Sequence, residues 1–197
     1  LRHRIEAAEE EARARTGRSL VAALDLARFV DDRLKVLMRE RGLRHDVIDA
    51  VAARADRDVI ALRVKKAERM QAFLATPDGE NLLAAYRRAS NIVAAEEKKD
   101  GVEYSGAPDV KFAETEEERA LFAALDTLEP RVAAALAAED FPAAMDAMAE
   151  LRAPVDAFFE AVLVNAENPV VRRNRLCLLN RVRGAMRRVA VWDAIEG

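Results

Sequence analysis

The residues best suited to binding a ligand are seven arginines near the C-terminal end of the sequence. No acidic residue lies between Asn168 and Trp192. Guanidinium groups make planar, bidentate contacts with phosphates and guanine edges, so this composition predicts an anion-binding surface. A solvated helix face is the alternative, although such a face normally mixes both signs of charge. The arginines are Arg172, Arg173, Arg175, Arg181, Arg183, Arg187 and Arg188.

The same segment has the apolar spacing of a long helix that begins at Asn168-Pro169 and ends near Val191. On a helical wheel, an arc of roughly 100° collects the apolar residues, and six arginines cover the other half. Arg175 alone points into the apolar arc. We therefore expect Arg175 to be structural and to pair with a buried carboxylate or carbonyl. The apolar residues are Leu178, Leu179, Val182, Met186 and Val189.

A second polar cluster follows one predicted helix near the middle of the chain. Arg87, Asn91 and Lys98 are spaced by four and seven residues, so they share a side of the helix. Asn91 could contact a base. Glu96 and Glu97 partly neutralise the cluster. The residues alone therefore favour an ordinary solvated face here. The cluster comprises Arg87, Arg88, Asn91, Lys98 and Lys99.

Residues for catalysis or metal binding are scarce. The pair His45-Asp46 allows the hypothesis of a metal-dependent phosphohydrolase, but such a site needs further ligands and only His3 remains. Asp46 is also explained as a helix cap. Cys177 has no nearby histidine, and we find no glycine-rich phosphate loop. We predict no catalytic residue and no metal site in this chain.

The composition and periodicity predict an all-α fold. Only 7 glycines and 6 prolines occur in 197 residues, and apolar residues recur every three or four positions nearly throughout. Ser19, Asp46, Asp58 and Asp78 are expected to open helices, and Gly42 to end one. The helices are expected at 3–15, 19–41, from Asp46, from Asp58, from Asp78, from 116 to near Pro130, and at about 130–139, 142–151, 154–164 and 169–191.

Turn signals divide this helical pattern. Thr76-Pro77-Asp78-Gly79 breaks the chain, which predicts a helical segment over 1–76 that continues an upstream part and a helical-bundle domain over 78–197. Residues 99–114 are expected to be an irregular loop. Thr115 and Glu118 then have the spacing of a capping box.

Charge is distributed unevenly along the chain. Residues 1–95 carry 19 basic and 15 acidic side chains, residues 96–160 carry 6 and 17, and residues 161–197 carry 7 and 3. A local basic face can therefore exist although the net charge is −3. No apolar run is long enough to span a membrane, and the start is not typical of a signal peptide. Because the first residue is Leu1, we expect a piece of a larger protein; the single cysteine fits a reducing compartment.

Several segments resemble the late region of the β subunit of bacterial heterotetrameric glycyl-tRNA synthetase. The most specific one, Ala153–Glu160, is followed by Val162–Ala166 and then by Arg172–Leu176. The similarity extends over essentially the whole chain. The other matching segments are Phe29–Lys35, Arg44–Val51 and Tyr86–Val93.

The resemblance implies a cytoplasmic α2β2 enzyme that joins glycine to tRNA(Gly) with ATP and Mg. It places the active site on the α subunit and most tRNA binding on the β subunit. The part after Asp78 is similar to the helical anticodon-binding domain of arginyl-tRNA synthetases. This chain is then expected to bind the anticodon arm, to catalyse nothing alone, and to bind neither DNA nor a membrane.

Under this resemblance, both basic clusters are expected to contact RNA. Basic side chains on a rigid helix bind phosphates, and the acidic segment could orient the stem-loop by repulsion. A helical scaffold for subunit association remains the alternative. The expected tRNA-binding residues are Arg87, Arg88, Asn91, Lys98, Lys99, Arg172, Arg173, Arg181, Arg183, Arg187 and Arg188.

Overall fold

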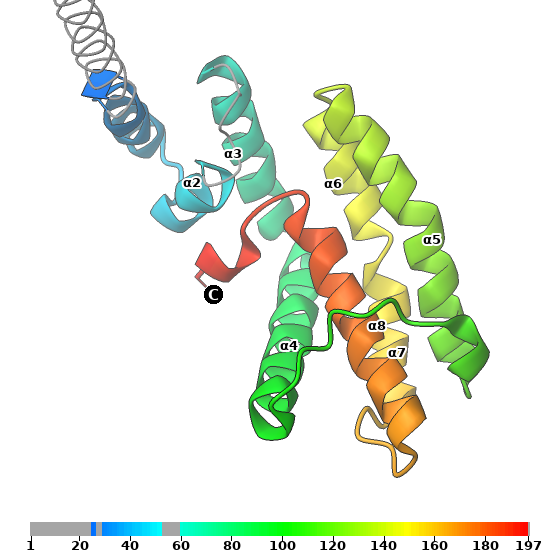
Figure 1. Cartoon of the computed structure of the whole chain (residues 1–197). Helices are drawn as coiled ribbons and strands as arrows, with labels where there is room; N and C mark the ends of the chain where they lie inside the picture. Colours follow the sequence, from blue (N-terminus) through cyan, green and yellow to red (C-terminus); the bar gives the residue numbers. More distant parts are fainter. Residues whose placement is uncertain (1–24, 27–28, 53–59, 197) are drawn as a thin grey trace, which may run out of the picture. The chain divides into compact units, whose positions relative to one another are not determined.

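The computed structural model describes residues 25–26, 29–52 and 60–196, and within them the regular structure is helical, without strands. The prediction of an all-α fold is confirmed (Figure 1). The expected helix over 3–15 and the expected caps Ser19 and Asp58 lie outside the described residues. The chain divides into two compact units, Leu1–His45 and Asp46–Gly197. The predicted boundary between 76 and 78 stays a prediction.

In the first unit, residues 29–40 form a helix that ends where the sequence predicts. Gly42 has a φ of 81°, the left-handed conformation that glycine adopts without steric cost. The N–H of Gly42 donates to the carbonyl of Arg39 at 2.9 Å, and the N–H of Leu43 donates to that of Met38 at 3.1 Å. These two bonds close the last helical turn.

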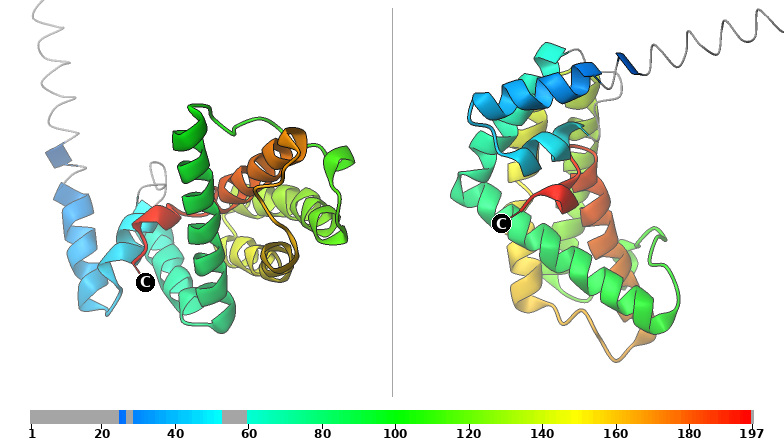
Figure 2. Two further views of the ribbon diagram at one scale, coloured as in Figure 1. Left: turned by 90° about the horizontal axis from the view of Figure 1, so that it is seen from below. Right: turned by 90° about the vertical axis from the view of Figure 1, so that its left-hand side faces the viewer.

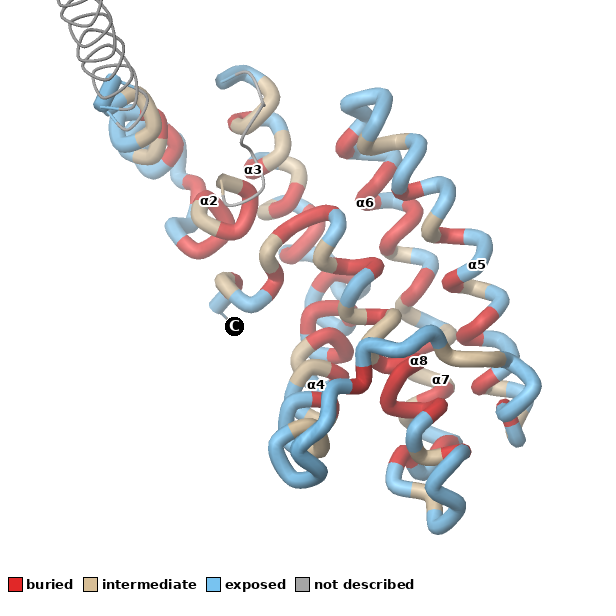
Figure 3. The backbone as a smooth tube through the Cα atoms, in the orientation of Figure 1, coloured by how far each residue is buried: buried red, intermediate tan, exposed pale blue. Residues whose placement is uncertain are grey.

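The second unit is a helical bundle (Figure 2). Helix α5 packs against α6, α7 and α8, and α4 packs against α3, α7 and α8. The side of each helix that faces its neighbours is buried, and the outer side is exposed (Figure 3). The elements that the structure describes are α2 (His45–Ala52), α3 (Ile60–Leu74), α4 (Pro77–Asp100), η1 (Val110–Phe112), α5 (Glu116–Ala137), α6 (Phe141–Ala149), α7 (Arg152–Ala161), α8 (Pro169–Arg187) and η2 (Trp192–Ala194).

Two helix starts differ slightly from the prediction. Helix α4 begins at Pro77 rather than Asp78, because Thr76 is the cap and its Oγ1 accepts the N–H of Gly79 at 3.1 Å. Helix α2 begins at His45, so Asp46 lies in the first turn instead of capping it. The Asp46 carboxylate accepts the backbone N–H of Glu196 at 2.8 Å, which fastens the C-terminal segment to α2.

Gly79 is required where α3 turns into α4. A Cβ on Gly79 would lie 2.0 Å from the carbonyl oxygen of Phe73, a distance that no side chain tolerates. The turn therefore brings two backbones together at the point where the sequence pattern breaks.

Two predicted helix ends are wrong. Helix α5 continues through Pro130 to Ala137, so the separate helix expected at 130–139 is its last part. Pro130 is exposed, as is Asp126, whose carbonyl loses the N–H partner, and solvent can replace that bond. Helix α8 ends at Arg187 instead of near Val191, because the N–H of Val191 donates to the carbonyl of Ala50 at 3.0 Å.

Other predicted ends are confirmed. Thr115 and Glu118 form the capping box of α5, and the side chain of Asn168 caps α8. The segment expected to be a loop is irregular from Gly101 to Asp109, and η1 follows it directly. It is fastened to α8 by Asn174, whose amide accepts the N–H of Asp109 at 2.8 Å and donates to its carbonyl at 3.1 Å.

Candidate nucleic-acid interface

Helix α8 is the element that positions most of the predicted binding residues. Its first turn contacts the end of α4 through Arg172, Glu96 and Asp100. Its last turn contacts the middle of α4 through Arg187 and Tyr86. The two helices are therefore antiparallel. On its other side, α8 contacts α5 (Figure 1).

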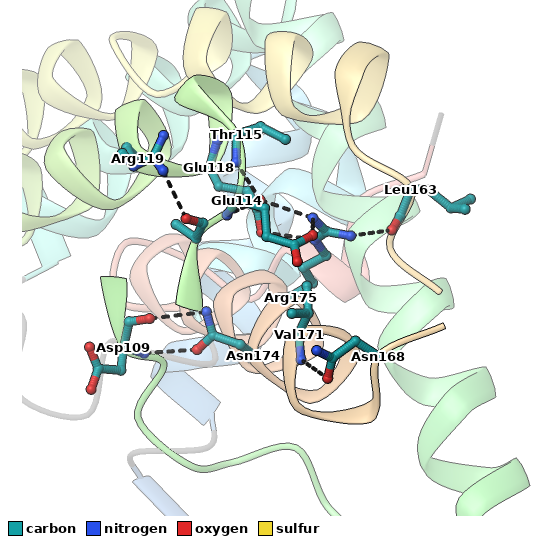
Figure 4. Close-up of polar contacts among 11 residues, drawn as sticks. Asp109, Glu114, Thr115, Glu118, Arg119, Leu163, Asn168, Val171, Asn174 and Arg175 are labelled. Atoms are coloured by element: carbon teal, nitrogen blue, oxygen red, sulfur yellow. Dashed lines mark hydrogen bonds and ion pairs between the residues drawn. The ribbon is translucent and has the colours of Figure 1, made fainter. Parts of the chain in front are cut away.

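Arg175 is the structural arginine that the sequence predicts. It is 5% exposed, and Glu118 is 0% exposed. Its Nε donates to Glu118 Oε1 at 2.8 Å, and its Nη2 donates to Glu118 Oε2 and to Glu114 Oε2, each at 3.0 Å. Its Nη1 donates to the carbonyl of Leu163 at 3.0 Å (Figure 4). Arg175 thus joins α8 to the start of α5 and to the segment after α7.

The ionisation of Glu118 depends on this arginine. Burial acts to raise the pKa of the Glu118 carboxyl, but hydrogen bonds from Arg175 and from the backbone N–H groups of Thr115 and Glu114 oppose it. The hydrogen bonds prevail, so the pKa of Glu118 lies below its usual value. The carboxylate is therefore charged in the bundle at neutral pH.

Arg172 also makes ion pairs. Its Nη2 donates to Glu96 and, at 2.6 Å, to Asp100, while its Nη1 donates to the hydroxyl of Tyr104 at 3.1 Å. The hydrogen bond to Asp100 raises the pKa of this guanidinium. Its Nε donates to Asn165 at 3.0 Å. The guanidinium of Arg172 therefore bonds to groups of the protein itself, and it holds the first turn of α8 against the end of α4.

Arg181 and Arg187 are occupied in the same manner. Arg181 donates to Glu129 at 3.0 Å and to Asp126 at 2.6 Å, which ties α8 to α5. Arg187 donates to the hydroxyl of Tyr86 at 2.8 Å, and to Asp193 at 2.7 Å. Carboxylates from other elements thus compensate for the absence of acids in α8. Part of the acidic charge of residues 96–160 is neutralised inside the bundle.

Three α8 arginines differ from these. Within the described residues, Arg173, Arg183 and Arg188 form no ion pair, and we call them the free arginines. Arg173 and Arg188 are exposed and Arg183 is half-buried. The Arg173 guanidinium lies 6.0 Å from the centre of the Tyr104 ring. Arg173 and Arg188 are 15 positions apart, and Arg188 is the C-cap of α8 with helical backbone angles, so their Cα atoms are about 22 Å apart.

The α4 cluster is only partly brought together. Arg87 is half-buried and donates to the carbonyl of Ile195 at 2.6 Å. Arg88 is exposed and lies over the ring of Phe159, with its guanidinium carbon 4.2 Å from the ring centre. Lys99 contacts Glu96 at 3.4 Å, so it lies beside Arg172 at the end of α4.

The remaining members of the α4 cluster, Asn91 and Lys98, are exposed. Together with Arg88 and the free arginines of α8, they offer polar groups to an external ligand. The described residues contain no group of three His, Cys, Asp or Glu side chains arranged around a possible metal position. In the same part of the chain, no helix is both long enough and apolar enough to cross a membrane.

Sequence reasoning missed the partners of the α8 arginines. Arg172 and Glu96 are 76 residues apart, and Arg181 and Glu129 are 52 apart. Spacing within one helix shows which side of it a residue occupies, but not which helix lies opposite. It also missed that Phe159 supports Arg88, since the aromatic pair Phe158-Phe159 is equally typical of a packed core.

Arginines that lie along one helix without ion pairs are an electrostatic feature of nucleic-acid-binding surfaces. Residues 82–189, which run from α4 through α8, match the family described as DALR anticodon binding domain. The chain belongs to this family.

Curated relatives agree with this assignment. The chain is 59% identical over 173 residues to the glycine–tRNA ligase beta subunit of Cereibacter sphaeroides, an alignment that covers 88% of this chain and 25% of that protein. It is 57% identical over 173 residues to that of Dinoroseobacter shibae (88% and 24%) and 53% identical over 175 to that of Paracoccus denitrificans (89% and 26%). The resemblance to the β subunit family is confirmed. The chain spans about a quarter of the length of these relatives.

Proposed function

We propose that this chain is the part of a glycine–tRNA ligase β subunit that binds the anticodon arm of tRNA(Gly). The observation that carries the proposal is that the family match runs from α4 to α8 and includes all three free arginines. Phosphates of an RNA stem-loop are the ligands that these guanidinium groups suit best. The chemical step takes place elsewhere in the enzyme.

Within the proposed enzyme, glycine, ATP and Mg bind at an active site on the α subunit. The β subunit associates with it as an α2β2 tetramer in the cytoplasm. This chain supplies tRNA affinity but no catalytic residue. The names of the relatives support this assignment, and the site residues proposed for RNA are the free arginines together with Arg88, Asn91 and Lys98.

Four of the other residues expected to bind tRNA already have partners within the protein. Arg172, Arg181 and Arg187 are held by carboxylates, so an RNA phosphate would have to compete with those ion pairs. Arg87 is similarly held by a backbone carbonyl. We therefore assign these four residues to positioning α8 and the C-terminal segment. Lys99 shares Glu96 with Arg172 but remains 67% exposed, so it stays a candidate contact.

The test measures the equilibrium binding of fluorescently labelled tRNA(Gly) to the full-length gene product that contains this chain. The affinity for a tRNA with an altered anticodon is measured for comparison. The double variant Arg173→Gln/Arg188→Gln is expected to bind at least tenfold more weakly. A control with the same charge change, Arg131→Gln/Arg152→Gln, removes arginines that form surface ion pairs on other helices, and is expected to bind normally. Equal affinity of both variants would contradict the proposal. Association with the α subunit without tRNA binding would favour the scaffold alternative.

A further inference from the structure

A cavity lies between α4 and α7, lined by residues other than the free arginines. Its volume is about 220 Å³, and it is open to solvent on one side. It lies on the part of α4 that carries Arg88, whereas Tyr86 on the same helix faces α8. Residues that line it include Asn81, Ala84, Arg88, Asp156, Phe159 and Glu160.

Arg88 and Phe159 line one wall of the cavity and together form a cationic platform. The guanidinium carbon of Arg88 lies 4.2 Å from the centre of the Phe159 ring, a stacking distance. Phe159 is itself held edge-to-face against Phe158, with ring centres 5.6 Å apart and an interplanar angle of 74°. Phe158 is 0% exposed, so the platform is anchored in the core. Arg88 is exposed, so its guanidinium is accessible to a second planar group.

The rim of the cavity carries hydrogen-bonding groups that the protein does not use. Asn81 and Glu160 are exposed, and the side chain of neither forms a hydrogen bond within the described residues. An Asn amide offers both donors and an acceptor, whereas a Glu carboxylate only accepts. Asp156 is held by Arg152 at 3.3 Å and adds negative charge to the same rim. This set suits a planar ligand with both donors and acceptors along its edge.

A phosphate does not fit this cavity. Asp156 and Glu160 would repel an anion, and the positive charge of Arg88 is spread over an aromatic face. A nucleobase is neutral and planar, stacks on arginine guanidinium groups, and can donate an exocyclic amino group to a carboxylate. The cavity is small enough to select a single base rather than a stacked pair.

We propose that this cavity takes one unstacked base of an RNA loop, and that it prefers a base with an exocyclic amino group over uracil. The base stacks on Arg88, its amino group donates to Glu160, and Asn81 contacts the rest of its edge. The inference rests on the proposed function, because the tRNA must first be held by the free arginines. It adds sequence selectivity to a surface that otherwise binds phosphates.

The test couples changes in the protein to changes in the RNA. Ala84→Leu fills the cavity with a good helix former on the exposed side of α4, and Arg88→Ala removes the platform. Each is combined with a series of anticodon-loop RNAs in which one nucleotide at a time is abasic. Arg131→Gln is the control, and circular dichroism verifies that each variant is folded.

We expect one loop position at which the abasic change weakens binding to the wild-type chain about tenfold. The intact RNA should bind to Ala84→Leu and to Arg88→Ala about tenfold more weakly than to the wild-type chain. In these variants, the same abasic change should weaken binding little further. Uridine at that position should weaken wild-type binding, and Glu160→Gln should reduce this discrimination.

Abasic losses that are the same in wild-type and both cavity variants would overturn the inference and leave the proposed function standing. An absence of RNA binding by the wild-type chain in its full-length gene product would overturn both. If only one cavity variant folds, the inference is decided by comparing the abasic losses of that variant with those of the wild-type chain.

Discussion

Replacing Arg175 by methionine is expected to destabilise the bundle strongly. The change keeps an unbranched apolar stem of similar length but removes both hydrogen bonds that the arginine donates to Glu118, which is 0% exposed. Removing one partner of a buried ion pair costs about 3–5 kcal/mol. Glu118 still accepts the N–H groups of Glu114 and Thr115, so we expect the lower end of that range, about 3 kcal/mol.

The loss of stability should depend on pH with a definite sign. In the wild-type chain, the pKa of Glu118 is lowered, so its contribution is present above the unfolded pKa of about 4.3 and is lost as the pH falls through the folded value. In Arg175→Met, burial dominates and raises the pKa of Glu118, so the variant gains relative stability when Glu118 is protonated. The difference in unfolding free energy between the two proteins should therefore be largest at pH 7 and should shrink towards pH 4.

Urea unfolding followed by circular dichroism measures this difference. With a slope of about 2 kcal/mol per M, a loss of about 3 kcal/mol lowers the midpoint by about 1.5 M. Arg188→Met is the matched control, since the same substitution at the C-cap of the same helix removes an exposed arginine without an ion pair, and it should change stability by less than about 0.5 kcal/mol. Adding Glu118→Gln to Arg175→Met should recover part of the loss.

Equal effects of Arg175→Met and Arg188→Met at pH 7 would show that the buried ion pair between Arg175 and Glu118 does not stabilise the bundle. A penalty for Arg175→Met that grows as the pH falls from 7 to 4 would contradict the expected pH dependence.

Three smaller perturbations test local features, each by the same urea unfolding measurement. Thr115→Ala should cost about 1 kcal/mol because Thr115 Oγ1 accepts the N–H of Glu118 in the capping box, and no change in midpoint would contradict this role. Gly101→Ala should cost about 1 kcal/mol because Gly101 has a φ of 66°. Gly184→Ala, in the last turn of α8 with no atom within 4 Å of the added Cβ, should instead stabilise the chain by about 0.5–1 kcal/mol, and a loss there would contradict the open surroundings.

The helices and some inward-facing residues follow from local sequence, because a helix repeats every 3.6 residues and its caps depend on neighbouring side chains. Arg175 is the clearest case, since its position on the apolar arc required a buried partner. The partner itself, Glu118, could be named only from the structure, because the two residues are 57 positions apart.

Predictions that depended on distant neighbours were wrong. Pro130 was expected to end a helix, but α5 continues since the proline lies on the exposed side and Leu128 and Val132 stay buried around it. The end of α8 is set by a hydrogen bond from Val191 to Ala50, far away in the chain. Neither effect leaves a local signal.

The sequence predicted where the candidate interface lies, but not which of its arginines form ion pairs within the protein. The sequence placed six arginines on the outer half of α8, and the structure pairs Arg172, Arg181 and Arg187 with carboxylates. The distinction matters for function, because an arginine that already holds a carboxylate contributes less to binding a new anion.

The central claim is that the free arginines of α8 contact RNA phosphates, and the salt dependence of tRNA affinity tests it most directly. Each phosphate contact contributes about 0.7–0.9 to the slope of log K against log salt concentration. The triple variant Arg173→Gln/Arg183→Gln/Arg188→Gln should therefore bind tRNA(Gly) with a slope shallower by about two units than the wild-type chain. The control Arg131→Gln/Arg152→Gln should leave the slope unchanged, and an unchanged slope in the triple variant would contradict the account.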